Sequence, residues 1–114
     1  KIDHILYKSR AYNSILSLKK ILPPSTPHEC RLGKWYDNEG RRRFAKTASY
    51  GKIVAPHNIV HENANANLGY LDGDAERATI ANAATIIKNF EKMEEASEEL
   101  FKTMEQMLEE SKAL

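Results

Sequence analysis

The sequence contains little cysteine, glycine or proline, and almost no net charge. Its one cysteine, Cys30, excludes an internal disulfide and is typical of a reducing compartment such as the cytoplasm. Five glycines and four prolines in 114 residues exclude a collagen-like or low-complexity chain. Seventeen Lys and Arg against sixteen Asp and Glu leave a net charge of +1. We therefore expect no overall field that draws nucleic acid or an anionic membrane.

Long apolar runs are also missing. No stretch approaches the roughly 18 apolar residues that a membrane-spanning helix needs, and nothing has the order of a signal peptide. We expect a cytoplasmic protein with no membrane insertion. The length, with 41% hydrophobic and 29% charged residues, fits a single domain over residues 1–114. Because a helical pattern is already running at Lys1, we expect a piece of a longer protein.

The first half of the chain has helical periodicity interrupted by prolines. Apolar residues spaced by three and four predict a helix over residues 2–22, which Pro23 and Pro24 end. Residues 30–48 are predicted to form two short helices, separated by a turn at residues 38–40. This part of the chain therefore supplies one long helix and one broken helix.

The second half is predicted to hold two further helices. Pro56 suits the first turn of a helix that continues to about residue 71, where Gly73 ends it and Asp74 caps the next. Residues 74–114 are expected to form one long helix. Its apolar or small residues alternate gaps of three and four: Ala83, Ile86, Phe90, Met93, Ser97, Leu100, Met104 and Met107. Such a 3.5-residue seam packs against the rest of a bundle or against a second copy.

No window alternates with a period of two, so we predict an all-α fold. Its simplest form is an antiparallel four-helix bundle with the second helix short or broken. Residues 1–71 carry the chemical motifs, and the charged residues outside the seam are expected to form a solvated helix face. The run of arginines at 41–43 is too short to indicate a nucleic-acid site, and a solvated or intersubunit face is the better interpretation.

Histidines and the cysteine are the candidate metal ligands. His57 and His61 are spaced i and i+4, which places two imidazoles on one helix face within reach of one ion. Cys30 adds the thiolate that zinc favours, and His4 falls on the inward face of the first helix. Taken singly, His4 is better explained as a hydrogen-bonded core histidine and Cys30 as a small buried hydrophobic residue. Taken together, the four residues supply three nitrogens and one sulfur for a tetrahedral Zn²⁺.

The residues at this point match a known pattern. The string Cys-Arg-Leu-Gly-Lys-Trp-Tyr at 30–36, with His4 before it and His-Asn-Ile-Val-His at 57–61 after it, resembles the chemoreceptor zinc-binding (CZB) domain. The resemblance covers about residues 2–61. It implies a bacterial cytoplasmic regulatory domain, helical and often homodimeric, attached to a chemoreceptor signalling domain or to a diguanylate cyclase.

The resemblance also implies a cofactor and its ligands. Zinc would be bound by three histidines and one cysteine, which are His4, Cys30, His57 and His61. It implies a response to zinc availability or to oxidants such as hypochlorous acid, with Cys30 as the redox-sensing residue. A structural or dimerisation module stapled by zinc is the alternative. His28 is not carried over and is expected to lie exposed near the site.

Catalytic motifs are missing from the sequence. A zincin needs Glu directly after the first histidine of its pair, and position 58 is Asn. Four protein ligands would also leave no coordination position for water. No phosphate-binding loop or nucleophile elbow is present, so we expect a binding domain and not an enzyme. Trp35 and Tyr36 are expected to cover the site with apolar area.

Overall fold

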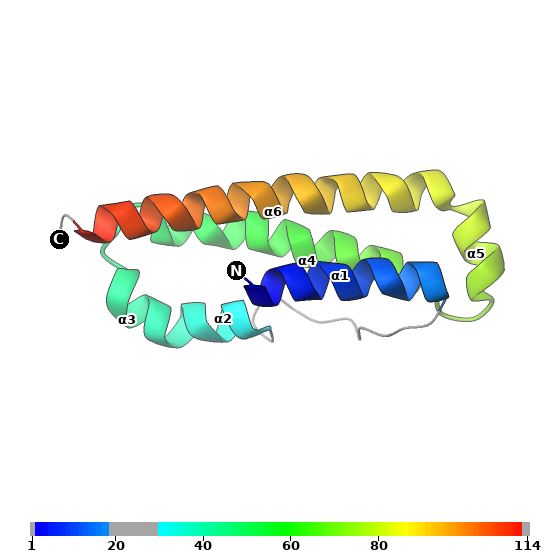
Figure 1. Ribbon diagram of the computed structural model, residues 1–114, viewed down its shortest axis with the longest axis horizontal. Coiled ribbons are helices and arrows are strands. Elements are labelled where there is room, and N and C mark those ends of the chain that lie inside the picture. Colours follow the sequence, from blue (N-terminus) through cyan, green and yellow to red (C-terminus); the bar gives the residue numbers. More distant parts are fainter. Residues whose placement is uncertain (1, 19–29, 113–114) are drawn as a thin grey trace.

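The computed structural model describes residues 2–18 and 30–112, and its regular elements there are all helical (Figure 1). In chain order they are α1 (Ile2–Ser17), α2 (Arg31–Trp35), the π-helical turn η1 (Tyr36–Gly40), α3 (Arg41–Phe44), the 3-10 turn η2 (Tyr50–Ile53), α4 (Val54–Gly69), α5 (Ala75–Ala81) and α6 (Ala83–Lys112). The predicted all-α class with a short, broken second helix is confirmed.

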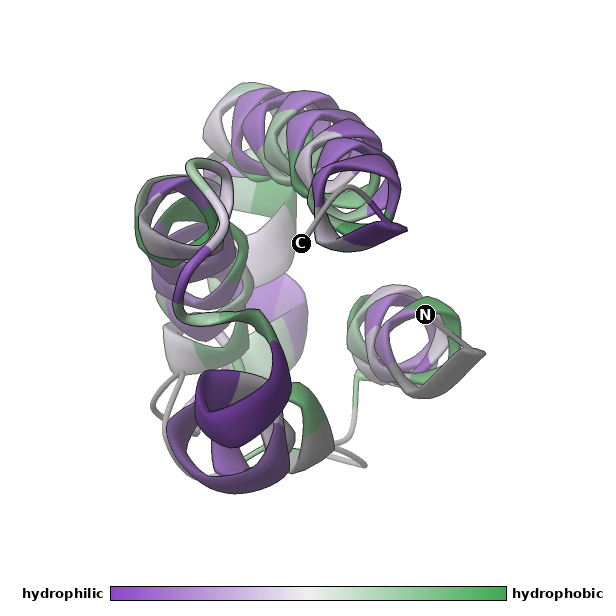
Figure 2. Cartoon of the chain, turned by 90° about the vertical axis from the view of Figure 1, so that its left-hand side faces the viewer, coloured by the Kyte–Doolittle hydropathy of each residue, from purple (hydrophilic) through white to green (hydrophobic). Residues whose placement is uncertain are grey.

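A long antiparallel hairpin of α4 and α6, joined through α5, organises the fold. The helix α1 lies along the half of this hairpin nearer α5, and α2 and α3 lie along the other half (Figure 1). Seen end on, α1 stands apart from α2 and α3 on the other side of the molecule (Figure 2). The two shorter segments therefore cover different halves of the hairpin, and they do so from different sides (Figures 1 and 2).

Each half has its own hydrophobic cluster. The first joins α1 to α4 and the first part of α6 through Tyr7, Ala11, Ile15, Val60, Ala64, Leu68, Leu71, Ile86, Met93 and Ala96. The second joins α2, α3 and η2 to the last part of α6 through Leu32, Phe44, Ile53, Leu100 and Met107. Five of the eight predicted seam residues of α6 are buried, namely Ile86, Met93, Ser97, Leu100 and Met107, whereas Ala83 is exposed and Ala96 and Thr103 are buried outside the seam. Within this chain the seam therefore packs into both clusters. The side chains of His4, Cys30, His57 and His61 form a group between the two clusters.

The helix α1 ends earlier than its apolar pattern predicts. It stops at Ser17, and Leu18 adopts a φ of 57°, a left-handed conformation that no continuing helix permits. The hydroxyls of Ser14 and Ser17 donate to carbonyls one turn back, which competes with regular helix bonding near this end. The predicted continuation of this helix is therefore wrong at Leu18. Its remaining part, residues 19–22, and the prolines expected to end it, Pro23 and Pro24, lie outside the described residues.

The predicted turn at residues 38–40 is also wrong. Residues there form the π-helical turn η1, which leads without a break into α3. Gly40 is buried, and a Cβ added there would lie 2.9 Å from the indole ring of Trp35. Gly40 is therefore a site of close packing and not a chain reversal, a role that the sequence alone does not distinguish.

The junction after α4 matches the sequence prediction. Gly73 has a φ of +73°, and the Asp74 carboxylate caps α5 by accepting from the Arg77 amide at 3.2 Å. The expected single helix over residues 74–114 is nevertheless divided. Asn82, with a φ of −113°, separates α5 from α6 and turns its amide back to the Ala78 carbonyl.

Across 2–18 and 30–112, none of the helices combines the length and the apolar character that crossing a bilayer requires.

We predict that Gly40→Ala destabilises the protein by about 1 to 3 kcal/mol, because the new methyl group would press on the Trp35 ring. Chemical denaturation measures this change. Gly69→Ala is the matched control, since a Cβ at Gly69 meets nothing within 4 Å, and it should leave stability unchanged or slightly raised. Equal effects of the two substitutions would contradict the packing role of Gly40.

Candidate metal centre

The two hydrophobic clusters meet at a group of three histidines and a cysteine. His4 lies near the start of α1, His57 and His61 lie one turn apart on α4, and Cys30 is the N-cap of α2. One ligand atom from each of the four lies within 4.8 Å of all the others. The structure thus brings together all four of the residues that the sequence singled out, from three separate segments.

The side chains face one another closely. The Cys30 Sγ is 3.2 Å from Nε2 of His57 and 4.0 Å from Nε2 of His4. The ring centroids of His4 and His57 are 4.9 Å apart, and those of His57 and His61 are also 4.9 Å apart. The i, i+4 spacing on α4 therefore does what the sequence predicted, and His4 completes the group from the neighbouring helix.

Burial makes this group unusual. His4, His57 and His61 are 2%, 4% and 1% exposed, whereas Cys30 is only partly buried. Burial, followed by the proximity of His57 and His61, lowers the pKa of His4 from 6.5 to about 3. At neutral pH the His4 ring is therefore an uncharged imidazole with a lone pair available to a metal ion.

The donor set fits zinc. Bonds of about 2.0 to 2.3 Å around a tetrahedral Zn²⁺ place its nitrogen and sulfur ligands about 3.3 to 3.6 Å apart. The Sγ to Nε2 separations of 3.2 and 4.0 Å bracket this range, so small side-chain adjustments would place the four atoms around one ion. In addition, Nδ1 of His4 is buried and has no hydrogen-bond partner among the described residues. A buried imidazole nitrogen without a partner is costly unless something binds the ring.

Cys30 has a second structural role. Its Sγ accepts a hydrogen bond from the Gly33 amide at 3.4 Å, and so caps the N-terminus of α2. An amide donor stabilises the thiolate over the thiol, and the thiolate is the form that binds metal. Gly33 thus contributes its backbone N–H to the sulfur.

Tyr7 forms the wall of the site, which the sequence did not predict. Its ring centroid lies 4.6 Å from that of His61 and 5.7 Å from that of His4, and it is 7% exposed. The expected cover residues have other ring contacts, because Trp35 packs on Phe44 and Tyr36 stacks on Tyr50. The signal for Tyr7 was its place one turn after His4 on the inward face.

One histidine of the sequence is not in the group. His28 lies outside the described residues, so its expected position near the site has no structural test.

Comparison with known proteins gives one match. Residues 4–68, more than half of the chain, match the family model described as chemoreceptor zinc-binding domain. The matched range contains all four residues of the site and ends one residue before α4 does. No curated protein and no solved structure matches the chain.

We predict that Tyr7→Ala lowers the free energy of unfolding by about 3 to 5 kcal/mol, because it removes a buried ring that packs on two histidines. Tyr7→Phe keeps the ring and should cost less than about 1.5 kcal/mol. Urea denaturation of both variants checks this difference. A loss as large for Tyr7→Phe as for Tyr7→Ala would show that the hydroxyl, and not the ring, stabilises the site.

Proposed function

Because the chain belongs to the chemoreceptor zinc-binding (CZB) domain family, we propose that it is the zinc-binding sensory domain of a bacterial chemoreceptor. It would signal zinc availability, or the presence of an oxidant, through its group of three histidines and one cysteine. One observation supports this most strongly: four ligand atoms from three segments lie within 4.8 Å of one another, with the three imidazoles buried.

The four side chains would divide the work of holding zinc. His57 and His61, on adjacent turns of one helix, form a rigid two-nitrogen platform. His4 would bind from α1 and Cys30 from the start of α2, so ordering of both segments accompanies binding. A bound zinc ion supplies a redox-inert Lewis acid that holds a thiolate and three imidazoles in a tetrahedron. Four protein ligands leave no position for a reacting water, which favours binding over catalysis.

Oxidant sensing would depend on Cys30. It is the one partly exposed member of the group, and it is also the only one whose ligand atom is readily oxidised. With hypochlorous acid, two electrons pass from the thiolate sulfur to chlorine, an S–O bond forms, the O–Cl bond breaks and chloride leaves. The product is a sulfenic acid, which is a weaker metal ligand than the thiolate.

The position of Cys30 gives this reaction a structural consequence. The same sulfur accepts the amide of Gly33 at the N-terminus of α2. Oxidation would therefore weaken a zinc bond and a helix cap together, and α2 has only five residues with which to resist the change.

The alternative is a structural or dimerisation module whose zinc only stabilises the fold. Exposed apolar side chains on α1, at Ile5, Leu6 and Leu16, favour the proposal that the domain forms a homodimer.

Attachment to a diguanylate cyclase in place of a chemoreceptor is the other variant of the proposal. A sensor and a staple differ in that only a sensor loses or modifies its metal under physiological conditions.

We predict that the purified protein holds about one zinc ion per chain, and that His61→Ala and Cys30→Ala each lose it. Elemental mass spectrometry measures the content. Removal of zinc by a chelator should cost about 4 kcal/mol of stability if the free zinc was near a thousandfold above its Kd, seen as a lower Tm. His28→Ala is the histidine control and should keep its zinc. No metal in the wild type and a melting curve indifferent to chelator would refute the zinc proposal.

We also predict that stoichiometric hypochlorous acid releases zinc from the wild type but not from Cys30→Asp. A carboxylate is a competent zinc ligand and carries no oxidisable sulfur, so this variant keeps a four-ligand site. A chromophoric zinc indicator follows the release. All three methionines are present in both proteins, so equal release from the two would assign the effect to methionine and contradict a sensory role for Cys30.

A further inference from the structure

The helix α6 supplies none of the four candidate ligands, although it is the longest element and runs past both hydrophobic clusters. Any effect of metal binding on α6 must therefore pass through its neighbours. α4 is already packed firmly on α6 along the hairpin. α1 is the more isolated neighbour, and it carries His4 near its N-terminal end (Figures 1 and 2).

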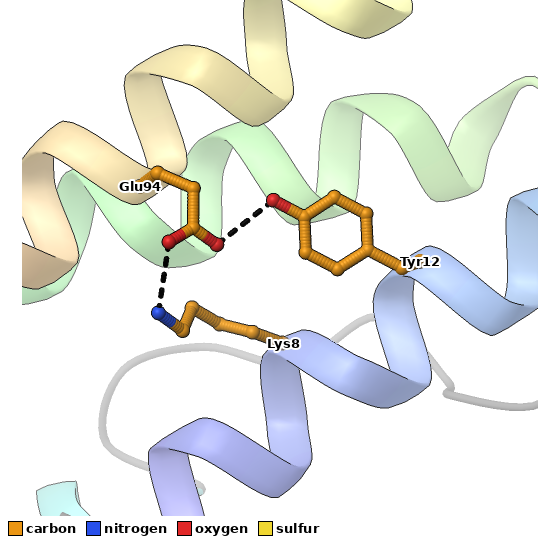
Figure 3. A network of polar contacts seen from close by, with 3 residues as sticks. All are labelled: Lys8, Tyr12 and Glu94. Atoms are coloured by element: carbon orange, nitrogen blue, oxygen red, sulfur yellow. Dashed lines mark hydrogen bonds and ion pairs between the residues drawn. The ribbon is translucent and has the colours of Figure 1, made fainter.

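A polar contact links α1 to α6 directly. Glu94 accepts from the Lys8 ammonium at 3.1 Å with one carboxylate oxygen and from the Tyr12 hydroxyl at 2.8 Å with the other (Figure 3). We call Lys8, Tyr12 and Glu94 the Glu94 clasp. Neighbouring rings support it, since Tyr12 packs on Phe90 at 4.3 Å and the Lys8 Nζ lies 5.7 Å from the Phe101 centroid.

The clasp holds the row of α1 that carries His4. His4, Lys8 and Tyr12 are spaced by four residues, so they follow one another along the same side of the helix. By binding Lys8 and Tyr12, Glu94 therefore fixes where this side of α1 lies along the helix axis. His4 extends toward the site from the same side of α1. The apolar contacts of Tyr7, Ala11 and Ile15 are non-directional and define this position less sharply.

The clasp is also weak enough to form and break as the occupancy of the metal site changes. The Lys8 side chain is 14% exposed and that of Glu94 is 48% exposed, so solvent screens part of the ion pair. Burial, with the hydrogen bond to Glu94, raises the pKa of Tyr12, so its hydroxyl remains a donor at neutral pH. A contact of this kind changes the equilibrium between docked and undocked α1 by about fivefold, so that both states remain accessible.

We propose that Glu94 is a positioning residue for His4, and that the Glu94 clasp makes zinc binding and the docking of α1 on α6 depend on each other. This rests on the proposed zinc-binding function. Because coupling between two equilibria is reciprocal, a clasp that aids zinc binding is itself strengthened by zinc. The clasp thus carries metal occupancy to a helix that has no ligand of its own.

The test compares Glu94→Ala with Glu95→Ala in the whole chain. Glu95 is the next residue of the same helix and faces the groove between α4 and α6, so the two substitutions are matched in charge and position. Zinc affinity is measured by competition with a chromophoric chelator. Glu94→Ala should weaken it about three- to fivefold, Tyr12→Phe by a smaller factor, and Glu95→Ala not at all.

Hydrogen exchange gives the second readout. Added zinc should slow exchange in the part of α6 around Glu94 in the wild type and in Glu95→Ala, and this effect should be lost in Glu94→Ala. Zinc-dependent protection of α4 should persist in all three, because α4 holds two ligands itself. A purely structural role would lower the Tm of Glu94→Ala without moving affinity or zinc-dependent exchange, and that result overturns the inference. Failure of the wild type to bind zinc would instead refute the proposed function.

Discussion

The burial of three imidazoles beside one thiol is the constraint on which the structure depends. The rings of His4, His57 and His61, at 4% exposure or less, give up most of their hydration, and the sulfur of Cys30 lies 3.2 Å from Nε2 of His57 and 4.0 Å from Nε2 of His4. A metal ion that binds all four replaces the lost hydration at once. In this account, the free energy of metal binding becomes part of the free energy of folding.

The helices are arranged so that this single point joins the molecule. α1 and the α2–α3 segment each cover half of the α4/α6 hairpin, and each has its own hydrophobic cluster. His4 lies at the inner end of one half and Cys30 at the inner end of the other, with the histidines of α4 beneath both. The four candidate ligands therefore join both halves of the bundle, whereas a group within one cluster would join only neighbouring side chains of that half.

Local patterns in the sequence predicted the grouping of the candidate ligands well and the detailed helix geometry less well. The i, i+4 spacing of His57 and His61, the string that begins at Cys30, and the break at Gly73 each depend on neighbours in sequence. By contrast, the turn predicted at Gly40 was wrong. A glycine can mark either a turn or a close packing contact, and only the structure shows that Gly40 packs on the Trp35 ring. The division at Asn82 accompanies a side-chain bond from its amide to the Ala78 carbonyl, which hydrophobic periodicity does not report.

The Glu94 clasp shows that local sequence patterns also do not reveal which charged residues make tertiary contacts. Glu94 lies in a dense run of charged residues, and only the approach of α1, more than 80 residues away in sequence, distinguishes it from its neighbours. Tyr7 is similar, since its role depends on which helix faces it. Residue type and spacing thus predicted the four candidate ligands that the structure brings together, whereas the contacts of Tyr7 and Glu94 became visible only in the tertiary structure.

X-ray absorption at the zinc edge on the purified protein tests the central claim most directly. One sulfur at about 2.3 Å and three nitrogens at about 2.0 to 2.1 Å are expected, and the sulfur contribution should vanish in Cys30→Asp. A zinc site with only nitrogen and oxygen ligands, or with two sulfurs drawn from two chains, would contradict a closed site built from His4, Cys30, His57 and His61 of one chain.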